Sequence, residues 1–185
     1  MCMELKIINE EIKNVDCKKV NPYCKGNVGN NLVKSNIAII GQQPSPFGNL
    51  KEPFTGKDKE LFDLILKKLN LDRTKVFITN VVKCASFYIS KDLIDFWKNY
   101  LVKELNIVKP KLIICLGKIS SSFFIPDFSS EHYYKIINKL NYTLFCAHHP
   151  SYAIRNGIEE WYLNKFDLLS LYISKVNINY KGGEG

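Results

Sequence analysis

No apolar run in this chain approaches the roughly 20 residues that a helix needs to cross a bilayer. Residues 1–10 carry Glu4 and Glu10 and lack the apolar core of a signal peptide. Repeats, low-complexity tracts and linkers are also missing. These absences argue against membrane, fibrous and disordered classes and predict an intracellular protein with no membrane partner. The 185 residues suit one domain over 1–185, with a core at about 17–176 and a mobile tail at 181–185.

Acidic residues are scarce relative to basic ones. Asp and Glu number 18 against 26 Lys and Arg, which gives a formal net charge of +8. A surplus of that size in a small domain favours a polyanionic partner, and nucleic acid is the commonest one. The alternative is a basic surface without such a partner, and charge alone does not separate the two.

The chain has six cysteines. In an intracellular protein an even number indicates buried thiols or metal ligation rather than disulfides. Cys115 and Cys146 lie in apolar runs and are expected to act as small core hydrophobes. Cys17, Cys24 and Cys84 have polar or basic neighbours, so these three are the candidate metal ligands.

Apolar runs alternate with amphipathic segments along the chain. Short apolar runs indicate buried strands, and hydrophobic residues at helical spacing indicate helices. This alternation predicts an α/β fold with a parallel sheet covered on both faces. Residues 126–141 fit neither pattern and are expected to form an irregular insertion. The predicted strands are 35–41, 75–80, 111–117 and 142–147, and the predicted helices are 57–69, 91–107 and 159–175.

Three of the predicted strands are followed directly by polar segments, at 42–56, 81–90 and 148–155. Taken singly, each has an ordinary structural explanation. An Asn after a strand is usually a cap or turn residue, and a His before a Pro often bonds its own loop. However, parallel strands end at one edge of the sheet, where ligands bind in such folds. The three segments are therefore expected to converge on one site.

Five short stretches in and around these segments resemble the motifs of the uracil-DNA glycosylase superfamily, most of all its family 4, the iron–sulfur type. Ile-Thr-Asn-Val-Val-Lys-Cys and His-Pro-Ser-Tyr are the specific matches, and the first loop is a degenerate one. The resemblance runs from about residue 17 to 171. It implies a three-layer α/β/α sandwich around a central four-stranded parallel sheet. The matching stretches are 41–45, 52–56, 78–84, 116–117 and 149–155.

The resemblance also implies roles for single residues in excising uracil from DNA. Phe54 would stack on the flipped base, and Asn80 would hydrogen-bond its Watson–Crick edge. His149 would donate to uracil O2 as negative charge develops there. Gly41 and Gln42 would supply backbone contacts to the base.

Residues 151–155 are expected to meet the DNA. By the same resemblance, Ser151 would bind a phosphate, and Tyr152 and Arg155 would press into the groove beside the flipped base. Lys83 either contacts a phosphate or is simply a solvated lysine.

The first loop departs from the family. Gln42 stands where family 4 has Glu, and Gln43 stands where related members have Asp or Asn before the Pro. No carboxylate remains next to the first strand, and an amide orients a water without taking its proton. We therefore expect His149, Gln43 and Gln42 to form a catalytic set of reduced activity.

The cysteine set departs too. The family holds a [4Fe–4S] cluster with four cysteines, and Cys17 and Cys84 match two of them. The other two positions fall on Asn14 and close to Trp97, while Cys24 is near enough to replace one ligand. Two alternatives follow: the chain retains the cluster, or Trp97 and its neighbours fill the volume.

Together these features predict a monomeric DNA-repair glycosylase that flips uracil out of DNA and hydrolyses its N-glycosidic bond. The main alternative is a weakened or inactive module that recognises damaged DNA on the same fold. A hydrolase of small nucleobase compounds is a third possibility, which the charge of +8 disfavours.

Overall fold

The computed structural model describes residues 2–48, 52–176 and 178, so the tail at 181–185 lies outside the described residues. Its centre is a sheet in the order β2-β1-β3-β5-β4. The four strands expected from the sequence are present and parallel, which confirms the α/β fold. They are β1 (Ile37–Gly41), β2 (Phe77–Asn80), β3 (Leu112–Leu116) and β5 (Thr143–Ala147).

The sheet has a fifth strand that the sequence did not reveal. β4 (Ile136–Asn138) pairs antiparallel with β5, within the segment expected to be irregular. The 3₁₀ turn η2 (Ser130–His132) precedes it. Three residues are too few to show a strand period, and only pairing with the longer β5 makes this segment a strand.

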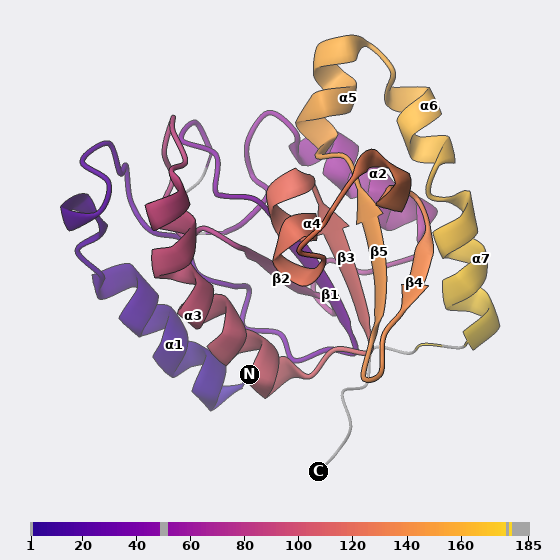
Figure 1. Ribbon diagram of the computed structural model, residues 1–185. Coiled ribbons are helices and arrows are strands. Elements are labelled where there is room, and N and C mark those ends of the chain that lie inside the picture. The colour runs from indigo at the N-terminus through magenta and orange to yellow at the C-terminus, as the bar shows by residue number, and fades with distance from the viewer. Residues whose placement is uncertain (1, 49–51, 177, 179–185) are drawn as a thin grey trace.

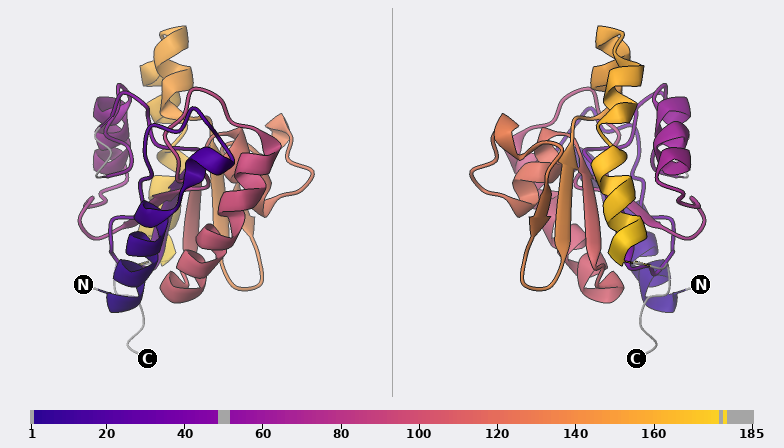
Figure 2. Two further views of the ribbon diagram at one scale, coloured as in Figure 1. Left: turned by 90° about the vertical axis from the view of Figure 1, so that its left-hand side faces the viewer. Right: turned by 90° about the vertical axis from the view of Figure 1, so that its right-hand side faces the viewer.

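Helices cover both faces of the sheet, as Figures 1 and 2 show. Successive strand residues point to opposite faces, so Ile37 and Ile39 join one core while Ala38 and Ile40 join the other. The first core includes α2 (Lys59–Lys68), α6 (Glu159–Asn164) and α7 (Asp167–Val176). The second includes α1 (Met3–Asn14), α3 (Lys91–Val108) and α4 (Lys118–Phe124). This is the expected three-layer sandwich.

Two helical segments differ from the sequence prediction. The expected helix at 159–175 is two helices, α6 and α7, that break at Lys165 and Phe166. Phe166 is fully buried against Phe145 and Tyr162, so packing of this side chain accompanies the break. Helix α1 lies ahead of the expected core and packs on α3. Among the described residues no helix is long and apolar enough to span a membrane.

The chain order places a crevice at one end of the sheet. From β1 the chain crosses to β2 on one side, and β3 lies on the other side of β1. Such a reversal separates the loops that follow β1 and β3, and ligands of doubly wound folds bind there. Figure 1 shows the short helix α5 (Pro150–Asn156) projecting beyond this same edge.

Candidate active site

His149 is held by the local structure at the start of α5. Pro150 occupies the first turn, where its missing N–H is not needed, and Gly157 ends the helix with a φ of 62°. The Ser151 backbone N–H donates to His149 Nδ1 at 3.3 Å, and Ser151 Oγ lies 2.9 Å from the same nitrogen. We assign Nδ1 as the acceptor of these contacts, which puts the ring proton on Nε2. Burial lowers the pKa of His149 below its ordinary value, with nearby Asp58 acting in the opposite direction. The site therefore presents a neutral imidazole whose Nε2–H is a donor at neutral pH.

Phe54, Asn80 and Gly41 meet at the end of β1. A Cβ on Gly41 would collide with Asn80 Oδ1 and lie 2.6 Å from Phe54 Cζ, so only glycine fits there. Phe54 has a left-handed φ of 55° and stacks on Phe62 with ring centroids 4.3 Å apart. Arg73 Nη2 donates to the Pro53 carbonyl at 2.6 Å, which helps to hold this strained turn.

The Asn80 amide is buried beside that turn. Its side chain is 2% exposed, and its Nδ2 makes no hydrogen bond to any residue that the structure describes. An unpaired buried donor is unfavourable by roughly 1–3 kcal/mol, which a ligand acceptor would relieve. A base reaches this amide only after the surrounding side chains shift.

A cavity of about 510 Å³ opens beside Phe54 and His149. It brings together side chains from two of the three segments predicted to converge, those after β1 and β5, together with the residues that lead into α2. The segment after β2 does not line it, and neither do Gly41 and Asn80. Residues of the predicted segments line it, and two residues outside those segments, Lys57 and Asp58, join them. The lining residues from the predicted segments are Gln42, Gln43, Pro44, Ser45, Phe47, Phe54, His149, Ser151, Ile154 and Arg155.

The two glutamines of the first loop differ in their contacts. Gln43 Nε2 donates to the Ser86 carbonyl at 2.6 Å, so this amide is tied to the loop after β2. The Gln42 carbonyl accepts from the Val82 N–H at 2.9 Å, which fixes the backbone of the two loops together. Gln43 therefore braces the cavity wall with its donor group, and the role of its oxygen in orienting water stays a prediction.

Asp58 supplies the cavity with a carboxylate. Its side chain is 12% exposed, and its Oδ2 lies 3.7 Å from His149 Nε2. No carboxylate stands directly next to β1, as the sequence indicates. Asp58, the N-cap residue of α2, nevertheless brings one into the cavity.

Both alternatives for Lys83, a contact to a DNA phosphate and a solvated lysine, are wrong. Lys83 is fully buried, and its Nζ lies 2.6 Å from Glu104 Oε2. Burial lowers its pKa, and the Glu104 carboxylate opposes that shift. Nζ also donates to the Asn80 carbonyl at 2.7 Å and to Thr79 Oγ1 at 2.6 Å. Lys83 thus holds the end of β2, from which Asn80 projects.

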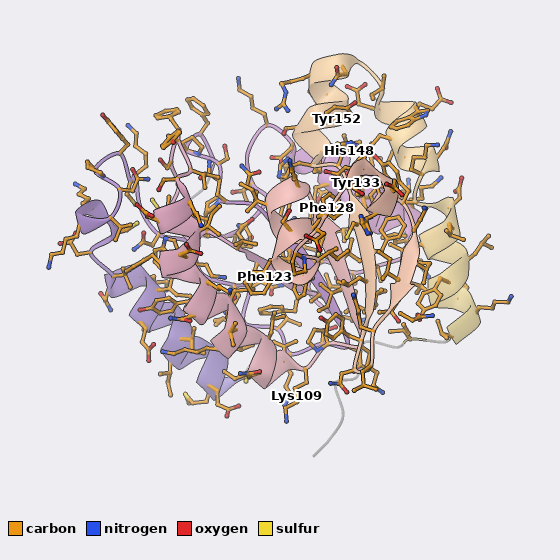
Figure 3. The ribbon with its side chains drawn as sticks, viewed as in Figure 1. Lys109, Phe123, Phe128, Tyr133, His148 and Tyr152 are labelled. Atoms are coloured by element: carbon orange, nitrogen blue, oxygen red, sulfur yellow. The ribbon has the colours of Figure 1, made fainter. Side chains whose placement is uncertain are left out.

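The predicted DNA-contacting residues lie on α5 rather than on a loop. Arg155 is exposed, and its Nη1 donates to Ser151 Oγ at 3.1 Å. Tyr152 stacks on His148 at 4.4 Å, and His148 stacks on Tyr133 at 3.8 Å. Figure 3 shows this aromatic column descending from α5. The column fixes the orientation of α5 at the cavity rim.

The cysteines divide as the sequence suggested. Cys115 and Cys146 are buried in β3 and β5. The sulfurs of Cys17, Cys24 and Cys84 lie within 4.8 Å of one another and form a group able to hold a metal ion. Zinc-bound thiolates with bonds of about 2.3 Å are spaced roughly 3.8 Å apart, so one shared ion needs only a small contraction.

Burial raises the pKa of the Cys17 thiol to about 11 and that of the Cys84 thiol further. Their thiolates therefore need a cation to form at neutral pH. The buried Trp97 indole N–H lies near Cys17 and makes no hydrogen bond to any described residue. The unpaired indole N–H could donate a hydrogen bond to a cysteine thiolate.

A four-cysteine cluster does not fit this group. Trp97 fills the position where the fourth family cysteine falls. Cys2 precedes the 12-residue helix α1, which is about 18 Å long, whereas Cys17 follows it. Among the described residues only three thiols gather here, so a fourth ligand has to come from outside the cysteine set.

A known protein family matches most of this chain. The family model described as the uracil DNA glycosylase superfamily matches residues 29–168, which include β1 to β5, His149 and Asp58. The chain belongs to this superfamily. The match covers most of the chain, so the fold and the order of the strand-end motifs are shared with the family.

Several relatives are named type-4 uracil-DNA glycosylase. The Pyrobaculum aerophilum protein is 29% identical over 168 residues, which is 83% of this chain and 86% of that protein. The Saccharolobus solfataricus protein is 30% identical over 169 residues, covering 82% and 78%. The Sulfurisphaera tokodaii protein is 29% identical over 170 residues, covering 82% and 76%.

Two cavity residues escaped the sequence prediction. Lys57 and Asp58 directly follow the 52–56 motif, and Asp before an apolar-periodic run predicts a helix N-cap. Asp58 does occupy that position, but its side chain makes no capping bond. The signal was its place beside a strand-end motif in a chain that lacks the usual loop acid.

Proposed function

We propose that this protein is a DNA-repair glycosylase that hydrolyses the bond between uracil and deoxyribose in DNA and leaves an abasic site. The observation that carries the proposal is the neutral His149, which offers its Nε2–H beside a cavity lined by the segments that follow β1 and β5. The relatives that are named type-4 uracil-DNA glycosylase support it.

The reaction separates charge across the glycosidic bond. The electron pair moves to the base, whose O2 becomes negative, while the sugar becomes cation-like. A flipped uracil would rest against Phe54, and a donor at O2 would stabilise the leaving anion. His149 is suited to this task because a neutral imidazole with its proton on Nε2 donates a hydrogen bond to O2 and keeps the proton.

Base selection is assigned to Asn80 in this proposal. One amide can donate to uracil O4 and accept from N3–H, and cytosine reverses both requirements. The unpaired Nδ2 of Asn80 supports the assignment. Gly41 and Gln42 would border the base with backbone groups.

DNA would bind across the rim of the cavity. Ser151 and Arg155 are proposed to contact phosphates, and Tyr152 and Ile154 to fill the space vacated by the flipped nucleotide. Tyr152 and Ile154 are 36% and 38% exposed on α5. We further propose that the chain acts as one domain and as a monomer on uracil-containing DNA inside the cell.

The three-cysteine group is proposed to hold a metal ion or a metal cluster with one non-cysteine ligand. Cys84 lies next to the segment that anchors Gln43, and Asn21 links Cys84 and Ser86 through its Nδ2. A metal here would therefore stabilise the loop that supports the active site, with no part in the hydrolysis.

Metal content tests the cysteine proposal. Protein purified without oxygen is expected to contain iron or zinc in a ratio near one site per chain, because the buried Cys17 and Cys84 thiols gain thiolate character only with a cation. Cys84→Ser should lower that content and the melting temperature, whereas Cys115→Ser should leave the metal content unchanged. If the wild-type protein contains no metal, or if its melting temperature is unchanged after the metal is removed, this assignment is contradicted.

Excision itself is tested with an oligonucleotide that carries one deoxyuridine. Alkali cleaves DNA at abasic sites, so strand scission after incubation with the protein is the expected result. A matched oligonucleotide with cytosine at the same position should stay intact. Absence of scission at high protein concentration would overturn the proposed activity.

A second function has one observation in its favour, the amides Gln42 and Gln43 in place of loop acids. A non-catalytic damage-recognition module would bind deoxyuridine DNA more tightly than undamaged DNA without releasing uracil. The same assay, combined with a gel-shift measurement of binding, separates the two functions.

A further inference from the structure

Asp58 has the surroundings of a group that serves a ligand rather than the fold. Its carboxylate lines the cavity, and it accepts no hydrogen bond from any residue that the structure describes. The Asp58 backbone carbonyl accepts from Phe62 N–H at 2.9 Å. The main chain of Asp58 therefore starts α2, and its side chain makes no capping hydrogen bond. A buried carboxylate without hydrogen bonds is unfavourable, and it persists where water or a ligand supplies them.

The distance between Asp58 and His149 suits a single water molecule. Oδ2 and Nε2 are 3.7 Å apart, beyond a direct hydrogen bond. One water placed about 2.8 Å from each atom spans this separation on the cavity side. It would accept from Nε2–H before uracil arrives and donate to the carboxylate.

Asp58 is also the only acid that lines this cavity among the described residues. Gln43 has its Nε2 engaged by Ser86, and an amide cannot take a proton from water. The charged and titratable groups that face Asp58 come from several elements: Lys57 beside it, His149 and Arg155 from the α5 segment, and the Tyr162 hydroxyl from α6.

We propose that Asp58 is the catalytic carboxylate that positions and deprotonates the attacking water, in place of the acid missing from the first loop. This inference rests on the proposed glycosylase function. The C1′–N1 bond breaks with its electron pair on uracil, and the water oxygen bonds to C1′. One water proton passes to Asp58 and then to solvent, while solvent protonates the released uracil anion.

The test compares single-turnover excision by the wild-type protein and Asp58→Asn on deoxyuridine DNA. The variant keeps the shape and removes the base, so its rate is expected to fall about 10²- to 10⁴-fold. Affinity for DNA with a non-hydrolysable 2′-fluoro-deoxyuridine should change less than threefold. Glu60→Gln removes an exposed negative charge from the same helix and should excise like the wild type.

Chemical rescue distinguishes chemistry from a structural effect. Added formate should restore part of the rate of Asp58→Ala. Active wild type with an Asp58→Asn rate within threefold overturns the inference and leaves the proposed function standing. Inactive wild type overturns the proposed function, and the inference with it.

Discussion

His149→Ala is expected to lower the single-turnover rate of uracil excision about 10²- to 10³-fold. Removing one preorganised donor to a developing oxyanion has roughly this effect, which corresponds to about 3–4 kcal/mol. The neutral ring with its proton on Nε2 makes His149 the best-placed donor of this kind in the cavity. Rates measured with saturating protein on a deoxyuridine oligonucleotide report the loss directly.

The control for this variant is His132→Ala. His132 lies in the η2 turn and bonds to Ser129, away from the residues that line the cavity. Its substitution should leave excision unchanged. A His149→Ala rate within threefold of the wild type would show that the oxyanion donor is another group.

Lys83→Met is expected to lower the free energy of unfolding by roughly 3–5 kcal/mol, because it leaves the buried Glu104 carboxylate without its counter-charge. Lys83 and Glu104 are both fully buried. Glu104 also accepts from Asn30 Nδ2 at 2.9 Å and from Thr79 Oγ1 at 2.9 Å, so the pair joins β2, α3 and the chain before β1. Urea denaturation followed by circular dichroism measures the change.

Lys103→Met is the matched control on the same helix as Glu104. Its ammonium lies 3.1 Å from Glu11, but these side chains are 55% and 45% exposed. An exposed pair contributes at most about 1 kcal/mol. Adding Glu104→Gln to Lys83→Met removes the stranded charge and should restore more than half of the loss. Equal losses from Lys83→Met and Lys103→Met would contradict this account.

The sheet was predictable from the sequence because its strands are buried on both faces. Runs such as Ile37–Gly41 and Leu112–Leu116 are apolar throughout, and that pattern requires helices on both sides. The motif residues Gly41, Asn80 and His149 stand directly at strand ends, so a parallel sheet brings them together. The local residues Pro150 and Gly157 also mark the limits of α5.

Other features depend on partners distant in sequence. β4 becomes a strand only by pairing with β5, and packing of Phe166 accompanies the break between α6 and α7. From the sequence, Lys83 resembles a solvated lysine in a loop. In the structure it is buried because it pairs with Glu104, which is 21 residues away in the chain. No local pattern of charge or hydrophobicity reveals such a partner.

The α/β layering, the motifs at three strand ends and the separation of core thiols from candidate ligands can all be inferred from the amino-acid sequence. These follow from local periodicity and from the rule that parallel strands end together. Three features emerge only from the folded structure: Asp58 faces His149, Lys83 is buried, and Cys24 lies with Cys17 and Cys84 beside the buried Trp97. Each of these depends on distances of a few ångströms between segments far apart in the chain, which three-dimensional packing sets.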